Sequence, residues 1–98
     1  MCTRQECFDR LHRAAPHIRR EFGVRSLCVF GSMARGTNRE GSDVDVFVDM
    51  PADAYKVLGL RSYLTDTLGT EVDVVRNHRN LSEFFLNEIK RDGIVIFS

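Results

Sequence analysis

Apolar positions recur along this chain with two different periods. Between Phe8 and Phe22 they return at helical spacing, while basic and acidic residues occupy the other faces. This pattern predicts an amphipathic first helix that Gly23 ends. Pro16 lies inside it and removes one backbone hydrogen bond, so we expect a kink or two abutting helices.

Three short segments predict strands. Residues 26–30 are mostly apolar and lead into Gly31, which is typical of a buried strand that enters a turn. Residues 43–48 alternate between valines and the group Asp43, Asp45 and Phe47, so this strand has two different faces. Residues 72–75 are apolar apart from one acid. The segment between the first two strands, residues 31–42, is expected to be a loop.

The remaining pattern predicts two helices and an apolar end. Residues 54–68 carry a helical apolar stripe, with Asp53 as a cap and Gly69 as the terminator. A shorter helix begins near Ser82, and residues 94–97 are apolar and can form a terminal strand. The order of elements predicts an α+β (mixed α/β) fold, with a small mixed β-sheet and helices packed against it. The strand order does not follow from the pattern.

Length and charge narrow the class of protein. With 98 residues the chain has room for one domain, residues 1–98, and its formal charge balances to zero. Direct binding to nucleic acid is therefore not expected. The chain has no apolar run of the roughly 20 residues that span a bilayer, and its first residues are polar, so we expect a cytoplasmic protein. Its three cysteines lack a metal-binding spacing and are expected to be free thiols.

The acids on the predicted strands suggest a metal site. Residues two apart on a strand point to the same side, so Asp43 and Asp45 hold two like charges next to each other. Such a pair is most stable where a cation neutralises it, and magnesium prefers hard oxygen ligands. Asp73 stands alone in a segment that we expect to be buried. If its strand neighbours the first acidic strand, the three carboxylates can hold two metal ions.

The turn after the first strand suggests a phosphate site. Gly31 leaves space for a phosphate to approach the backbone, and Ser32 and Arg35 add donors. A triphosphate held there would place its reactive phosphorus over the metals, with pyrophosphate as the leaving group. Each feature alone has an ordinary explanation as a turn, a loop or an exposed strand edge. Their combination favours nucleotide chemistry.

The segment Gly31-Ser32-Met33-Ala34-Arg35-Gly36 followed by Ser42-Asp43-Val44-Asp45 resembles the signature of the DNA polymerase beta-like nucleotidyltransferase superfamily. That signature is Gly-Ser, ten intervening residues and Asp-x-Asp, and the third acid falls on Asp73. The chain is most similar to the minimal nucleotidyltransferases. The resemblance implies that Asp43, Asp45 and Asp73 are catalytic metal ligands, and that Gly31, Ser32, Arg35 and Ser42 bind the nucleotide.

The resemblance also implies a substrate and a partner. Minimal members use ATP and magnesium, with two ions, and typically act as antitoxins that add AMP to a tyrosine of a HEPN-domain toxin. Two alternatives stay open, namely transfer to a small molecule or an RNA end, and inhibition of the partner by binding alone. The apolar residues Phe84, Phe85 and 94–97 either form a partner surface or close the core. The base preference, the number of nucleotides added and the oligomeric state do not follow from the sequence.

Overall fold

A computed structural model describes residues 3–39 and 43–98. Within these ranges the chain forms, in order, the elements α1 (Arg4–Phe22), β1 (Ser26–Phe30), α2 (Gly31–Arg35), β2 (Val44–Asp49), α3 (Ala54–Leu68), β3 (Val72–Arg76), α4 (Glu83–Asp92) and β4 (Ile94–Phe97). The predicted α+β fold is confirmed, and residues 94–97 do form a strand.

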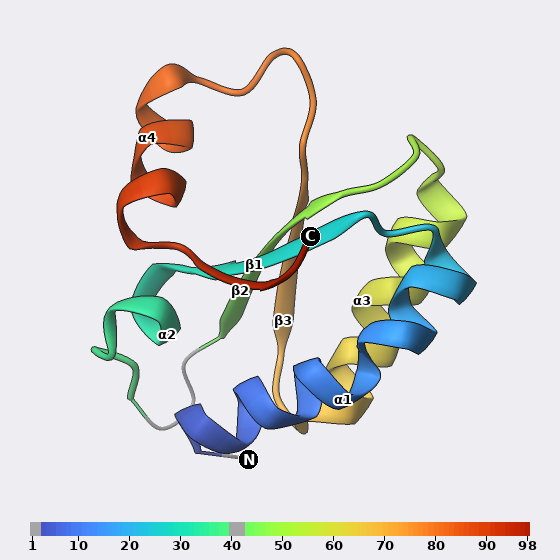
Figure 1. The fold of residues 1–98 in the computed structure, drawn as a ribbon, viewed down its shortest axis with the longest axis horizontal. Coiled ribbons are helices and arrows are strands. Elements are labelled where there is room, and N and C mark those ends of the chain that lie inside the picture. The colour runs from blue at the N-terminus through green and yellow to red at the C-terminus, as the bar shows by residue number, and fades with distance from the viewer. Residues whose placement is uncertain (1–2, 40–42) are drawn as a thin grey trace.

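The sheet has four strands in the order β3-β2-β1-β4 (Figure 1). Strand β1 runs antiparallel to both of its neighbours, whereas β2 and β3 are parallel. The parallel pair is connected through α3, since parallel strands need a crossover. The two acidic strands are therefore neighbours, and β3 and β4 form the edges.

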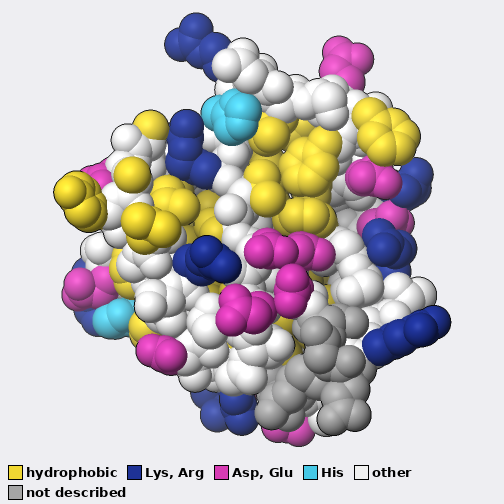
Figure 2. Space-filling view, turned by 180° about the vertical axis from the view of Figure 1, so that it is seen from behind, with side chains coloured by type: hydrophobic (Ala, Val, Ile, Leu, Met, Phe, Trp, Pro, Cys, Tyr) yellow, Lys and Arg dark blue, Asp and Glu magenta, His cyan; other side chains and the backbone are white. Residues whose placement is uncertain are grey.

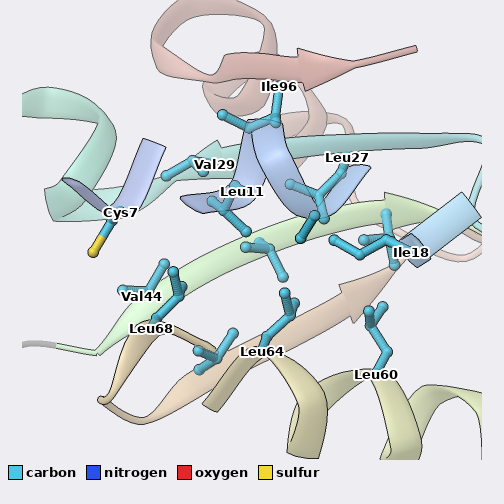
Figure 3. Close-up of a cluster of buried hydrophobic side chains, with 14 of the residues drawn as sticks. Cys7, Leu11, Ile18, Leu27, Val29, Val44, Leu60, Leu64, Leu68 and Ile96 are labelled. Atoms are coloured by element: carbon cyan, nitrogen blue, oxygen red, sulfur yellow. The ribbon is translucent and has the colours of Figure 1, made fainter. Parts of the chain in front are cut away.

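Helices α1 and α3 lie side by side over one face of the sheet (Figure 1). Their apolar stripes and the inward residues of the strands make the core, which Figure 3 shows in close-up. Several core side chains are completely shielded from solvent, among them Leu11, Ile18, Leu27, Val29, Val44, Val46, Leu60, Leu64, Leu68 and Val72. Burying these side chains is the main source of the fold's stability, at about 1.5–3 kcal/mol for each.

Of the two alternatives predicted at Pro16, a kink or two abutting helices, the second is wrong, because α1 is one continuous helix. It begins at the cap Thr3, whose side chain accepts a hydrogen bond from the backbone of Glu6, and it ends at Gly23 with φ 68°. Pro16 is exposed on the outer side. The buried residues Leu11 and Ile18 hold both halves of the helix against the core, which offsets the one hydrogen bond that proline removes.

Three other expectations need correction. Residues 31–35 form the short helix α2 where a loop was expected, because five residues are too few to show a helical period. Asp73 is exposed, since β3 is an edge strand and not a buried one. Cys7 is disulfide-bonded and Cys28 is a free thiol, so the prediction of three free thiols was wrong.

The second face of the sheet carries α4 and α2 and is more open. Phe85 of α4 packs its ring against Phe30 and Phe47, with centroid distances of 5.4 and 5.8 Å. This helix lies mainly over β1, and Asp73 on the edge strand β3 stays exposed. The described helices include none that is long and apolar enough to cross a membrane.

Candidate functional site

Strand β2 separates the core from the acids by simple alternation. Val44, Val46 and Val48 are fully buried, and Asp45 and Phe47 between them point to the open face. Turning the strand over would bury the acids, which the core could not tolerate without partners. The orientation of Asp45 is therefore fixed by the valines on either side of it.

Asp45 and Asp73 lie directly opposite each other on the parallel strands β2 and β3. Partial burial raises the pKa of Asp45, the charges of Asp73 and Asp43 raise it further, and Arg35 lowers it. The side chains of Asp73, Asp43 and Arg35 thus lie close enough to Asp45 to change its pKa. Figure 2 shows a compact acidic group on this side of the molecule, bordered by a hydrophobic patch.

Gly31 brings the turn after β1 into contact with these acids. The residue before it, Phe30, is the ladder partner of Asp45 across β1 and β2. Gly31 has φ 71°. A Cβ atom at this position would overlap with Asp45 Oδ2. A side chain at this position would be strained by the backbone angle and would displace the carboxylate of Asp45. The predicted phosphate turn and the predicted metal ligands are therefore adjacent.

Helix α2 presents hydrogen-bond donors beside Asp45. No side chain caps its N-terminus, so the first backbone N–H groups remain available to an anion. The backbone carbonyl of Ser32 accepts the N–H groups of Gly36 and Thr37, which fixes the end of the helix. Arg35 is exposed and close enough to Asp45 to affect its charge. These groups together suit a phosphate chain.

Arg4 supports α2 from the first helix and was not predicted to have a role. Its guanidinium donates to the carbonyl oxygens of Met33 (2.7 Å) and Ala34 (3.0 Å). Both carbonyls lie in the last turn of α2, where helix carbonyls lack partners and a positive charge is favourable. Arg4 is about thirty residues away in sequence from its acceptors, so no local pattern could have revealed it.

The acids fit a hard divalent cation better than a softer metal. The facing carboxyl groups of Asp45 and Asp73 offer the oxygen donors that magnesium prefers, and a bound cation would offset the repulsion between them. In residues 3–39 and 43–98 no three His, Cys, Asp or Glu side chains are already gathered at metal-binding distances. Without a cation, repulsion keeps like charges apart. Magnesium ions commonly take one or two carboxylates and complete their shell with phosphate oxygens and water.

Most of the residues predicted from the sequence meet at one place. Gly31 and Asp73 are placed against Asp45, and Asp43 and Arg35 lie close enough to shift its pKa. Ser32 follows Gly31 in the first turn of α2. Ser42 lies outside the residues that the structure describes.

The sequence of this chain is similar to those of known proteins. The family model described as "Polymerase beta, Nucleotidyltransferase" matches residues 14–98. The chain is 40% identical to the protein adenylyltransferase MntA of Thermococcus cleftensis over 77 residues, which cover 76% of this chain and 78% of the relative.

Two solved structures have a similar fold. One is a toxin–antitoxin complex with AMP-PNP, with a TM-score of 0.71 and 22% identity over 89% of this chain and 73% of the other. The second is a complex of a tri-AMPylated Shewanella oneidensis HEPN toxin with its MNT antitoxin, with a TM-score of 0.68 and 17% identity over 98% and 73% of the two chains. The family match covers most of the sequence and includes every described site residue. This chain is therefore an enzyme of the polymerase beta nucleotidyltransferase family.

Proposed function

We propose that this chain is a magnesium-dependent protein adenylyltransferase that moves AMP from ATP to a tyrosine hydroxyl of a HEPN-domain toxin and thereby acts as its antitoxin. The whole chain, residues 1–98, would work as one minimal nucleotidyltransferase domain. The observation that carries the proposal is the contact between Gly31 and Asp45, which is paired with Asp73. This contact unites a phosphate turn and a carboxylate cluster.

The residues divide into two groups. Asp43 and Asp45 would hold two magnesium ions, and Asp73 would complete the second site. Gly31, Ser32, Arg35 and Ser42 would bind the phosphates. Bound magnesium would neutralise the acids and the triphosphate and make the α-phosphorus more electrophilic.

The chemical step balances as a simple displacement. The acceptor oxygen forms a bond to the α-phosphorus, and the bond from this phosphorus to the bridging oxygen of the β-phosphate breaks. Pyrophosphate leaves with that electron pair. Asp73, which is more exposed than Asp45, would accept the proton of the acceptor hydroxyl. Arg35 and the N–H groups of α2 would hold the leaving phosphates in line.

The identity of the acceptor rests on relatives. The relative from Thermococcus cleftensis is named a protein adenylyltransferase, and the Shewanella oneidensis complex contains a HEPN toxin that carries AMP groups. The complex with AMP-PNP supports ATP as the donor. The open β2–β3 side of the sheet supports an acceptor that approaches from outside, because Asp73 is exposed there.

The test is intact-mass analysis of a HEPN-domain protein from the same genome after incubation with this chain, ATP and magnesium. We expect a gain of one or more AMP units. The gain should be lost in the Asp43→Asn, Asp45→Asn double variant and retained in Asp49→Asn, which removes a carboxylate from the same face of β2 outside the site.

Two results would contradict the proposal. If the double variant still neutralises the toxin fully, antitoxin action depends on binding alone. If AMP appears on RNA ends or small hydroxyl compounds but on no HEPN protein, the chemistry is right and the acceptor is wrong.

A further inference from the structure

The open face of β2 and β3 has two different rungs next to each other. Asp45 is paired with Asp73, and two residues further along the strands Phe47 is paired with Val75. Residues two apart on a strand lie about 6.6–6.8 Å from each other on the same face. An apolar rung thus follows directly after the acidic one, and both side chains of the apolar rung are only partly buried.

Helix α4 adds a wall to this apolar rung. Phe85 contacts Phe47 edge to face at 5.8 Å and also contacts Phe30, so its ring stands over the β1–β2 side. Val75 lies on the other side of Phe47, on the edge strand, and is only partly buried. We name Phe47, Val75 and Phe85 the apolar shelf. In Figure 2 a broad hydrophobic patch borders the acidic group.

The position of the shelf limits what can lie on it. Gly31 and α2 are at the β1 side of the acids, so the β- and γ-phosphates would extend in that direction. The α-phosphate would lie over Asp45 and Asp73. The nucleoside joined to it must then leave the acids in another direction, and the shelf is the neighbouring apolar surface one rung away.

We propose that the apolar shelf binds the base of the nucleotide by stacking against Phe85 over Phe47 and Val75. This inference rests on the proposed function and adds the base subsite to it. The shelf offers apolar and aromatic surface and no hydrogen-bond pattern, so it recognises a base by its flat face. Asp73 stays open at the sheet edge for the acceptor.

The test compares two ligands by calorimetry in excess magnesium, namely ATP and inorganic tripolyphosphate, which has no base. Wild-type protein should bind ATP at least about fivefold more tightly than tripolyphosphate, since stacking of one base on an aromatic side chain is worth about that factor or more. Phe85→Leu should remove most of this difference while its tripolyphosphate affinity stays unchanged, which also shows that the variant is folded.

Phe84→Leu is the matched control. Phe84 precedes Phe85 on the same helix and is 74% exposed, so its replacement should leave both affinities as they are. Equal binding of ATP by wild type and Phe85→Leu, or a loss that affects both ligands alike, would overturn the shelf while leaving the proposed function standing. Binding of neither ligand by the wild-type chain would overturn both. A defect in acceptor modification alone, with ATP affinity intact, would assign the shelf to the acceptor and overturn the inference.

Discussion

Repulsion between Asp45 and Asp73 should lower the stability of the metal-free protein. Asp45 and Asp73 are ladder partners, Asp45 is partly buried, and the charge of Asp73 raises the pKa of Asp45. Asp73→Asn removes one of the two negative charges and leaves an amide of similar shape that can donate a hydrogen bond to Asp45. We therefore expect this variant to unfold at a higher denaturant concentration than wild type when divalent ions are chelated.

The size of the effect follows from the charges. Two unit charges about 4 Å apart repel by about 1 kcal/mol in water and about 4 kcal/mol at the effective dielectric of a protein surface. Asp73 is exposed, so solvent screens the pair and the lower end applies. A gain of about 1 kcal/mol corresponds to roughly 4–8 °C in Tm for a domain of this size.

The assay is urea and thermal unfolding in a chelating buffer and again with excess magnesium. Magnesium should reverse the order, because a ligand at a hundred times its Kd stabilises the native state by about 2.7 kcal/mol and the variant has lost a ligand group. Asp49→Asn, on the same face of β2 but opposite Ser26, should change stability by less than about 0.5 kcal/mol. If Asp73→Asn is no more stable than wild type in chelator, the two carboxylates do not repel each other and the argument for a cation between them fails.

Three further predictions concern the surroundings of the acids. Arg4→Met removes two hydrogen bonds to α2 and should lower the free energy of unfolding by about 1–2 kcal/mol in urea titrations, with weaker ATP binding. An unchanged free energy of unfolding would show that α2 does not depend on Arg4. Gly31→Ala and Gly69→Ala both force an alanine to φ near 70°, at a cost of about 1–2 kcal/mol. Only the alanine at position 31 would also overlap with Asp45, so Gly31→Ala should lower the free energy of unfolding clearly more than Gly69→Ala. Equal losses would count against the contact between Gly31 and Asp45. Burial raises the pKa of the Cys28 thiol, so the native protein holds less thiolate at a given pH. Alkylation of Cys28, followed by peptide mass analysis, should be slower in the native protein than in the unfolded chain, and its rate should increase with pH only above the usual thiol range. Equal rates in the two states would contradict this prediction.

The sequence pattern predicted the strands of the site well because alternation reports directly on burial. The valines of β2 and their period of two determined which face Asp45 occupies, whereas the pairing of its strand with that of Asp73 was only a condition in the prediction and is supplied by the structure. Helix α3 was predicted with its boundaries because its stripe, cap and terminal glycine agree. Where local preference and burial point the same way, a single sequence is sufficient.

The sequence could not reveal features that depend on distant partners. Helix α2 is too short to show a period, and its support by Arg4 joins residues about thirty positions apart. The edge position of β3 depends on the strand order, which no local pattern contains. For this reason Asp73 was expected in a buried segment but is exposed, a position that suits the proton acceptor of the proposed reaction.

The two faces of the sheet separate stability from chemistry. Val44, Val46 and Val48 are fully buried, so a slip of β2 by one residue would expose three valines and bury Asp45. The cost of such a slip, several kcal/mol from lost burial alone, fixes the direction in which the acid points. Substitutions on the open face should therefore change catalysis with small or even favourable effects on stability, whereas substitutions of the valines should lower stability first and lose activity only through unfolding. This division explains how so short a chain can hold a repulsive group of carboxylates at its surface: the residues that position the acids are not the residues that carry the charge.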